Sequence, residues 1–121
     1  MPDTDAATKV VYPAGTREIG RLRRELAPEI HEAWDTFSRA VFSSGALPEK
    51  TKQLIAVAVA HTTQCPYCIS GHTRLAQRKG ASDKEIMEAI WVAAEMRAGG
   101  AYAHSTIALH TLSEGHTTNG H

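Results

Sequence analysis

Hydrophobic residues recur at helical spacing over the first third of the chain. Residues 17–26 mix charged and aliphatic side chains in a helical repeat, and Pro28 then suits the first turn of a helix over residues 28–42. The apolar positions of this second segment have a spacing close to i, i+3, i+4 and i+7, and they are Ile30, Ala33, Trp34, Phe37 and Val41. The pattern predicts two amphipathic helices.

The next segment, residues 48–62, becomes apolar on nearly all sides between Leu54 and Ala60. A helix of this kind usually lies at the centre of a core. The β-branched residues also fit a buried strand. Alternating alanines and an unbroken charged lead-in favour the helix, which opens with Pro48 in its first turn and Glu49 near the positive end of the dipole.

Further helices are predicted after this central one. Pro66 suits the start of a helix over residues 66–78, and Gly80 suits its C-terminal cap. Ser82 and Glu85 have the spacing of a capping box, which predicts the start of a fifth helix.

The fifth helix is expected to end near residue 97, because Gly99 and Gly100 follow it. A sixth helix is then predicted over residues 101–112. The expected fold is therefore an all-α bundle of about six helices.

The two ends of the chain lack a repeat of apolar residues. Residues 1–13 are expected to form a flexible arm and residues 114–121 a frayed tail, on either side of one helical domain over residues 14–113. A chain of 121 residues suits one domain.

The charge of the chain is balanced, with 13 basic and 13 acidic residues and a formal net charge of zero. This balance gives no broad field to attract nucleic acid or an anionic membrane. The longest apolar run, residues 54–60, is too short to cross a bilayer, and no early stretch has the pattern of a secretory signal. A soluble, cytoplasmic protein is expected.

The strongest chemical signal is the sequence Cys65-Pro66-Tyr67-Cys68, which contains both cysteines of the chain. A bridge between them would close almost no loop and would add little stability, so a redox or metal-binding role is favoured. On a helix, Cys65, Cys68 and His72 share one face. The helix N-terminus favours a thiolate, and His72 can accept the proton of Cys68.

Two alternatives use the same residues. His61, Cys65, Cys68 and His72 have the types and number of ligands for a tetrahedral zinc site. Glutaredoxins also contain Cys-Pro-Tyr-Cys, but their fold would place a strand before the motif, where this chain has a predicted helix.

Residues 47–112 resemble the AhpD-like, or carboxymuconolactone decarboxylase, family of helical proteins. The resemblance rests on the apolar segment and the cysteine motif, residues 54–68, and on four later segments: residues 72–73, 79–82, 85–86 and 98–104. It implies an all-α fold that forms homo-oligomers, either trimers or hexamers built from dimers. It also implies alkylhydroperoxidase or disulfide-reductase activity through the cysteine pair.

The resemblance also assigns roles to residues of the motif. Cys68 would be the thiol that attacks the peroxide, Cys65 the resolving thiol, and His72 part of a proton relay. The AhpD pattern has a glutamate in this relay where the chain has Gln53, and a histidine between the cysteines where it has Tyr67. An amide can orient water or bond His72, but it cannot exchange a proton as a carboxylate does.

Other residues are weaker candidates. Glu49 lies one turn before Gln53 and is either a substitute relay carboxylate or a solvated side chain at a helix start. His61 either supports the site or makes a structural hydrogen bond. Tyr102 and His104 are placed near the site or an interface, whereas Trp34 and Trp91 are expected in the core.

The expected function is thus a thiol-dependent, peroxiredoxin-type peroxidase. Its substrate is a hydroperoxide, and a lipoyl group or a thioredoxin-like protein supplies the reducing dithiol. No metal or organic cofactor is required. The alternatives are a disulfide reductase that acts on small disulfides, the zinc module, and a cysteine-independent lactone decarboxylase-like enzyme.

Overall fold

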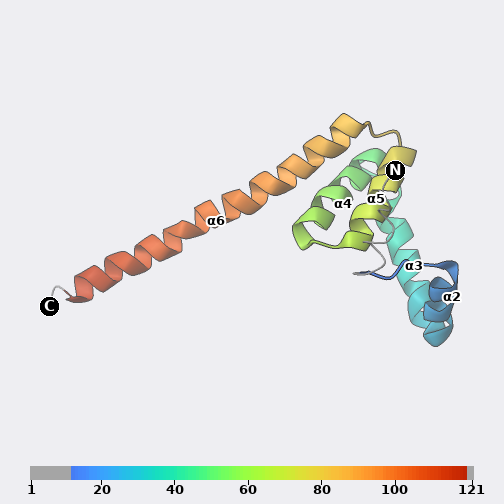
Figure 1. Ribbon diagram of the computed structural model, residues 1–121, viewed down its shortest axis with the longest axis horizontal. Helices are drawn as coiled ribbons and strands as arrows, with labels where there is room; N and C mark the ends of the chain where they lie inside the picture. The colour runs from blue at the N-terminus through green and yellow to red at the C-terminus, as the bar shows by residue number, and fades with distance from the viewer. Residues whose placement is uncertain (1–11, 120–121) are drawn as a thin grey trace. The chain divides into compact units, whose positions relative to one another are not determined.

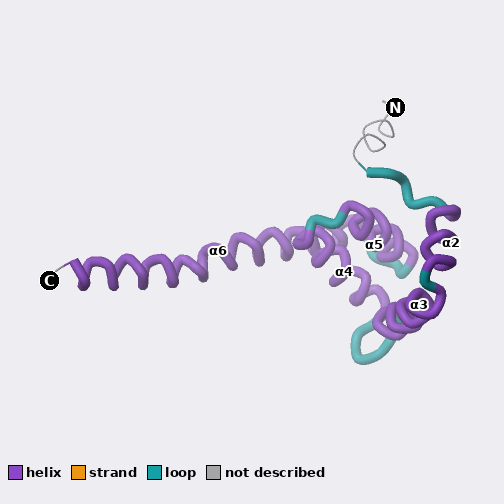
Figure 2. The backbone as a smooth tube through the Cα atoms, turned by 90° about the horizontal axis from the view of Figure 1, so that it is seen from below, coloured by secondary structure: helices purple, strands orange, loops and turns teal. Residues whose placement is uncertain are grey.

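The computed structural model describes residues 12–119, which form helices joined by short loops and contain no strand (Figure 2). The chain divides into two compact units between Ser43 and Ser44. The predicted all-α class is confirmed. Most of the arm expected over residues 1–13 lies outside the described range.

The first unit contains α2 (Arg17–Leu26) and α3 (Pro28–Phe42), with the bounds that the sequence predicts. Thr16 caps α2, because its side-chain oxygen accepts a hydrogen bond from the backbone of Ile19 at 3.2 Å. No residue of either helix is buried. The expectation that Trp34 belongs to a core is wrong, since two helices alone enclose no interior and this side chain is 61% exposed.

The second unit begins with α4 (Glu49–Thr63) and α5 (Pro66–Arg78), and α4 packs against both α5 and α6 (Figure 1). The alternative of a buried strand at residues 54–60 is therefore excluded. Three helices meet at a small core of Val57, Ala76, Ala81 and Ile86, against which Leu54 and Ile90 pack. Small side chains in this cluster allow the helices to approach closely.

The last element, α6, is one helix over Asp83–Asn119, and the predicted break at Gly99 and Gly100 does not occur. Each helical glycine costs roughly 1 kcal/mol relative to alanine, which weakens a helix without ending it. Neither glycine takes the positive φ of a helix stop; among the described residues only Gln64 and Gly80 do so. The tail expected to fray from residue 114 remains helical to residue 119.

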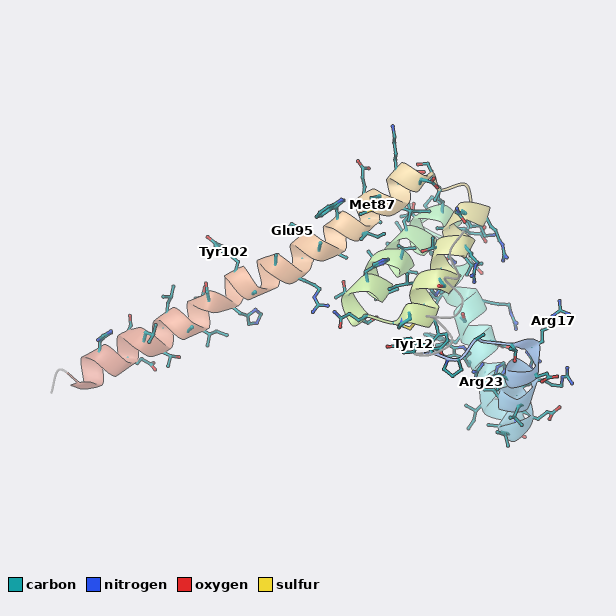
Figure 3. All side chains as sticks on the ribbon, viewed as in Figure 1. Tyr12, Arg17, Arg23, Met87, Glu95 and Tyr102 are labelled. Atoms are coloured by element: carbon teal, nitrogen blue, oxygen red, sulfur yellow. A yellow bond between two sulfur atoms is a disulfide. The ribbon has the colours of Figure 1, made fainter. Side chains whose placement is uncertain are left out.

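The far part of α6 extends beyond α4 and α5 (Figure 1). At 1.5 Å per residue, a helix of 37 residues is about 55 Å long. Its large apolar side chains are exposed. Tyr102, which points away from the helix in Figure 3, has an exposed fraction of 83%. Trp91, expected in the core, is 63% exposed, although its neighbour Ile90 packs against the core. No described helix is long and apolar enough to cross a membrane.

The predicted capping box at the start of α6 is present. The backbone of Glu85 donates to the Ser82 hydroxyl at 3.1 Å, and the Glu85 carboxylate accepts from the backbone of Ser82 at 2.9 Å. Lys50 of α4 also donates to this carboxylate at 2.9 Å. The Ser82 backbone N–H, and then the Lys50 ammonium, hold the pKa of Glu85 below its usual value.

We expect Glu85→Gln to destabilise the protein at neutral pH and to have no effect in acid. Because its pKa is lowered on folding, the Glu85 carboxylate stabilises the fold above its ordinary titration near pH 4.5, and this contribution fades as pH falls through the folded-state value. The difference in free energy of unfolding between wild type and variant should therefore be largest near pH 7 and close at lower pH. Glu88→Gln, on the same helix, is the control. A difference that persists in acid would contradict the account.

Candidate active site

A tight turn between α4 and α5 positions the cysteine motif. Gln64 ends α4 in the left-handed conformation, with φ of 57°, and the backbone of Cys65 donates to the carbonyl of Ala60 at 3.1 Å. Pro66 then opens α5, as its fixed φ and missing N–H allow at this position. The chain therefore reverses within two residues and places Cys65 at the N-terminal cap of α5.

Cys65 and Cys68 are joined in a disulfide, with their Cα atoms 5.2 Å apart. The Cys65 sulfur also accepts a hydrogen bond from the backbone N–H of Cys68 at 3.2 Å, in the place where serine or aspartate caps other helices. When the pair is reduced, this N–H group and the helix dipole favour the thiolate of Cys65 over the thiol. Both cysteines are partly buried.

The structure brings Gln53 of α4 to His72 of α5, across nineteen positions of sequence. The ring nitrogen Nδ1 of His72 lies 2.8 Å from the amide oxygen Oε1 of Gln53. Gln53 is 4% exposed and is the one buried polar residue of the described chain. With Nδ1 donating to this oxygen, the ring nitrogen that accepts a proton is Nε2. Gln53 thereby sets the tautomer of His72, one helical turn after Cys68.

The remaining candidates have other partners. Nδ1 of His61 lies 2.7 Å from the carbonyl of Val57, one turn back on α4, which is the structural bond considered for it. The Glu49 carboxylate pairs with Lys79 at 2.9 Å. Tyr67 lies in the first turn of α5 and is 51% exposed.

The zinc-site alternative finds no support in the geometry. Within residues 12–119, no three His, Cys, Asp or Glu side chains lie close enough together to hold a metal ion. The four proposed ligands therefore do not converge, and both cysteine sulfurs are already bonded to each other.

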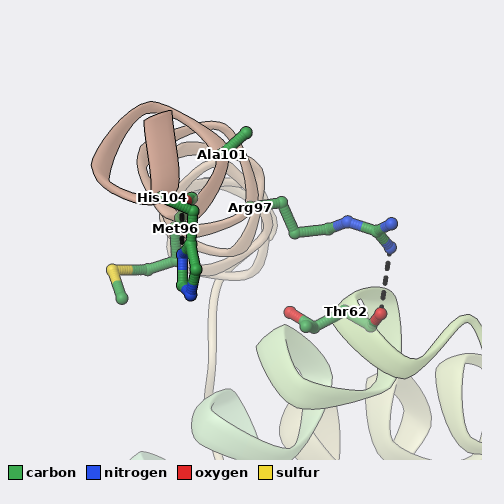
Figure 4. Close-up of a pocket in the computed structure, with 6 residues that line it drawn as sticks. Thr62, Met96, Arg97, Ala101 and His104 are labelled. Carbon is green, nitrogen blue, oxygen red and sulfur yellow. Dashed lines mark hydrogen bonds between the residues drawn. The ribbon is translucent and has the colours of Figure 1, made fainter. Parts of the chain in front are cut away.

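A second feature, which the sequence did not predict, lies where the end of α4 faces the middle of α6 (Figure 4). It is a hollow of about 500 Å³. The Arg97 guanidinium crosses from α6 to the carbonyl of Thr62, which accepts its hydrogen bond at 3.0 Å. His104 was expected near a site or an interface, and it lines this hollow. Only the continuity of α6 through Gly99 and Gly100 places Arg97 and His104 on one rigid element.

Comparison with known proteins agrees with this fold. Residues 28–111 match the model of the carboxymuconolactone decarboxylase family. A protein of the cox locus of Paracoccus denitrificans is 56% identical over 105 residues, which cover 87% of this chain and 94% of that protein. An alkyl hydroperoxide reductase of Mycobacterium tuberculosis is 34% identical over 83 residues, 64% of this chain and 24% of that longer protein.

Two crystal structures have the same architecture. One, a protein of Methanobacterium thermoautotrophicum, is 37% identical with a TM-score of 0.65, covering 69% of this chain and 93% of its own. The other is a carboxymuconolactone decarboxylase family protein of Legionella pneumophila, 29% identical with a TM-score of 0.62 over 91% of this chain and 89% of its own.

We expect Gln53→Leu, which keeps roughly the size of the side chain, to lower the free energy of unfolding by about 1–3 kcal/mol, because Nδ1 of the part-buried His72 loses its hydrogen-bond acceptor. The change would be measured by chemical denaturation of the disulfide form, so that the cysteines stay unchanged. Gln77→Leu, the same substitution on the exposed face of α5, is the control. Equal stabilities of wild type and Gln53→Leu would contradict the contact between Gln53 and His72.

Proposed function

This chain belongs to the carboxymuconolactone decarboxylase family, and we propose that it is a thiol-dependent alkylhydroperoxidase of the AhpD-like type. The observation that carries the proposal is the Cys65–Cys68 pair at the start of α5, one turn before a histidine whose tautomer a buried amide sets. The similarity to an alkyl hydroperoxide reductase of M. tuberculosis supports the same chemistry.

The first step of the cycle oxidises Cys68. Its thiolate attacks the terminal oxygen of a hydroperoxide, so that an S–O bond forms while the O–O bond breaks. Nε2 of His72 takes the thiol proton and returns it to the leaving alkoxide. The products are an alcohol and a sulfenic acid at Cys68.

The second step forms the disulfide. The Cys65 thiol attacks the sulfenic sulfur of Cys68, and the S–O bond breaks to release water. This step would leave the pair in the disulfide form that the structure has, which supports the proposal. A partner dithiol, a lipoyl group or a thioredoxin-like protein, then restores both thiols by exchange and becomes a disulfide itself.

A second function, disulfide reductase without efficient peroxide turnover, is favoured by Gln53. An amide holds His72 in place but cannot pass on a proton, so the relay ends at the histidine. Exchange with a disulfide substrate depends less on such a relay, since the helix N-terminus already stabilises the Cys65 thiolate. A cysteine-independent decarboxylase would not need the cysteine pair at the start of α5.

The test is a thiol count on reduced protein before and after a small excess of organic hydroperoxide. Wild type should lose both thiols. Cys65→Ser should stop after one turnover with a sulfenic acid at Cys68, which a dimedone adduct identifies, and Cys68→Ser should not consume peroxide. Thiols that ignore peroxide but oxidise with a small disulfide would assign the reductase function. Thiols inert to both would overturn the redox proposal.

We also propose that the protein works as a homo-oligomer, a trimer or a hexamer. Many large apolar side chains are exposed, including Leu109 at 63% on the part of α6 beyond α4 and α5. Exposed apolar side chains in this number are typical of a protein that buries them in a subunit interface.

Light scattering should give three or six times the 13.1 kDa of one chain. Leu109→Glu should lower that mass, because it places a charge in the apolar interface, whereas Thr111→Glu on another face of the same helix should not. A wild-type mass equal to one chain would contradict the oligomer.

A further inference from the structure

The hollow between α4 and α6 has a cationic group at its rim that no carboxylate neutralises. Within the part of the chain that the structure describes, Arg97 forms no ion pair. One of its five N–H donors bonds the carbonyl of Thr62, which leaves the fork of the guanidinium with further donors. An unpaired guanidinium of this kind binds carboxylates, often through two parallel hydrogen bonds.

The rest of the lining suits an apolar chain. Besides Arg97 and Thr62, the hollow is bounded by Met96, Gly100, Ala101 and His104. In Figure 4, Met96 and His104 lie on the same side of α6, while Arg97 reaches across to α4. Nδ1 of His104 is 2.8 Å from the carbonyl of Gly100, so this ring is held against its own helix. Among the residues that the structure describes, no acidic side chain lines the hollow.

The hollow is also close to the redox pair along the chain. Thr62 precedes Cys65 by three residues, and three residues span at most about 11 Å. An extended chain of eight to ten carbons covers a similar length. A ligand anchored at Arg97 by its acidic end is therefore long enough to present a group on its chain to the cysteines.

From these observations we propose that the Arg97 hollow binds the carboxylate of a fatty-acid hydroperoxide whose chain runs toward Cys65 and Cys68. This inference rests on the proposed peroxidase function and adds the substrate class. Arg97 acts as a specificity-determining residue, with Met96 in contact with the chain. The chemistry at sulfur is unchanged: the hydroperoxide group still yields an alcohol and a sulfenic acid at Cys68.

The test compares a fatty-acid hydroperoxide with its methyl ester, which has the same chain and the same reacting group without the charge. Wild type should have a KM for the acid about tenfold or more below that for the ester, given the strength of charge-assisted hydrogen bonds. Arg97→Gln should remove this preference by raising the KM for the acid to that for the ester. Arg97→Lys should keep part of it, and Arg78→Gln, an exposed arginine outside the hollow, should keep all of it.

A binding measurement separates this inference from the proposed function. Calorimetry with decanoate, which has no peroxide group, should show binding to the disulfide form of wild type and of Arg78→Gln, and its loss in Arg97→Gln. This binding result would support the site even if the protein turned over neither hydroperoxide. The absence of turnover would overturn only the peroxidase function. Equal decanoate binding by wild type and Arg97→Gln would overturn the site. So would an Arg97→Gln variant that changes the oligomer mass but not the preference for acid over ester.

Discussion

The hydrogen bond between Gln53 and His72 is the contact on which the arrangement of the site depends. The Gln53 amide is buried, so the loss of its partner would leave a polar group without compensation in the core. The bond therefore fixes the register of α4 against α5, beside the packing of Val57 and Ala76. Cys65, Cys68 and His72 all belong to α5 or its cap, so the helix itself sets their spacing, and the bond to Gln53 orients the His72 ring.

The small core explains why so much of the chain is left for other contacts. Three helices of the second unit enclose only a few side chains, most of them alanine or another aliphatic residue. The far part of α6 extends beyond α4 and α5, so its side chains stay exposed. The middle of α6 forms one wall of the Arg97 hollow. The same long helix thus supplies the surface of the proposed oligomer interface and one side of the proposed substrate site.

Local patterns predicted the parts of the structure that depend on local chemistry. Pro66 opens α5 where a proline fits the first helical turn, and the Ser82 capping box starts α6. The resemblance to the AhpD pattern also predicted that Gln53 and His72 belong to one site. The hydrogen bond between them depends on how α4 packs against α5. The two glycines at residues 99–100 led to a prediction of two helices in place of α6. Their low helix propensity is outweighed by the residues around them, so the helix continues. Arg97 was missed because its partner, a backbone carbonyl thirty-five positions away, leaves no mark in the sequence.

The proposed function requires that Cys65 and Cys68 carry out one peroxide-driven cycle between dithiol and disulfide. The most direct measurement is the intact mass of fully reduced protein after one equivalent of organic hydroperoxide, together with the amount of alcohol formed. We expect a mass lower by about 2 Da, from the loss of two hydrogens to an internal disulfide, with one alcohol released per chain. An unchanged mass with intact hydroperoxide, or addition of oxygen with no disulfide, would contradict it.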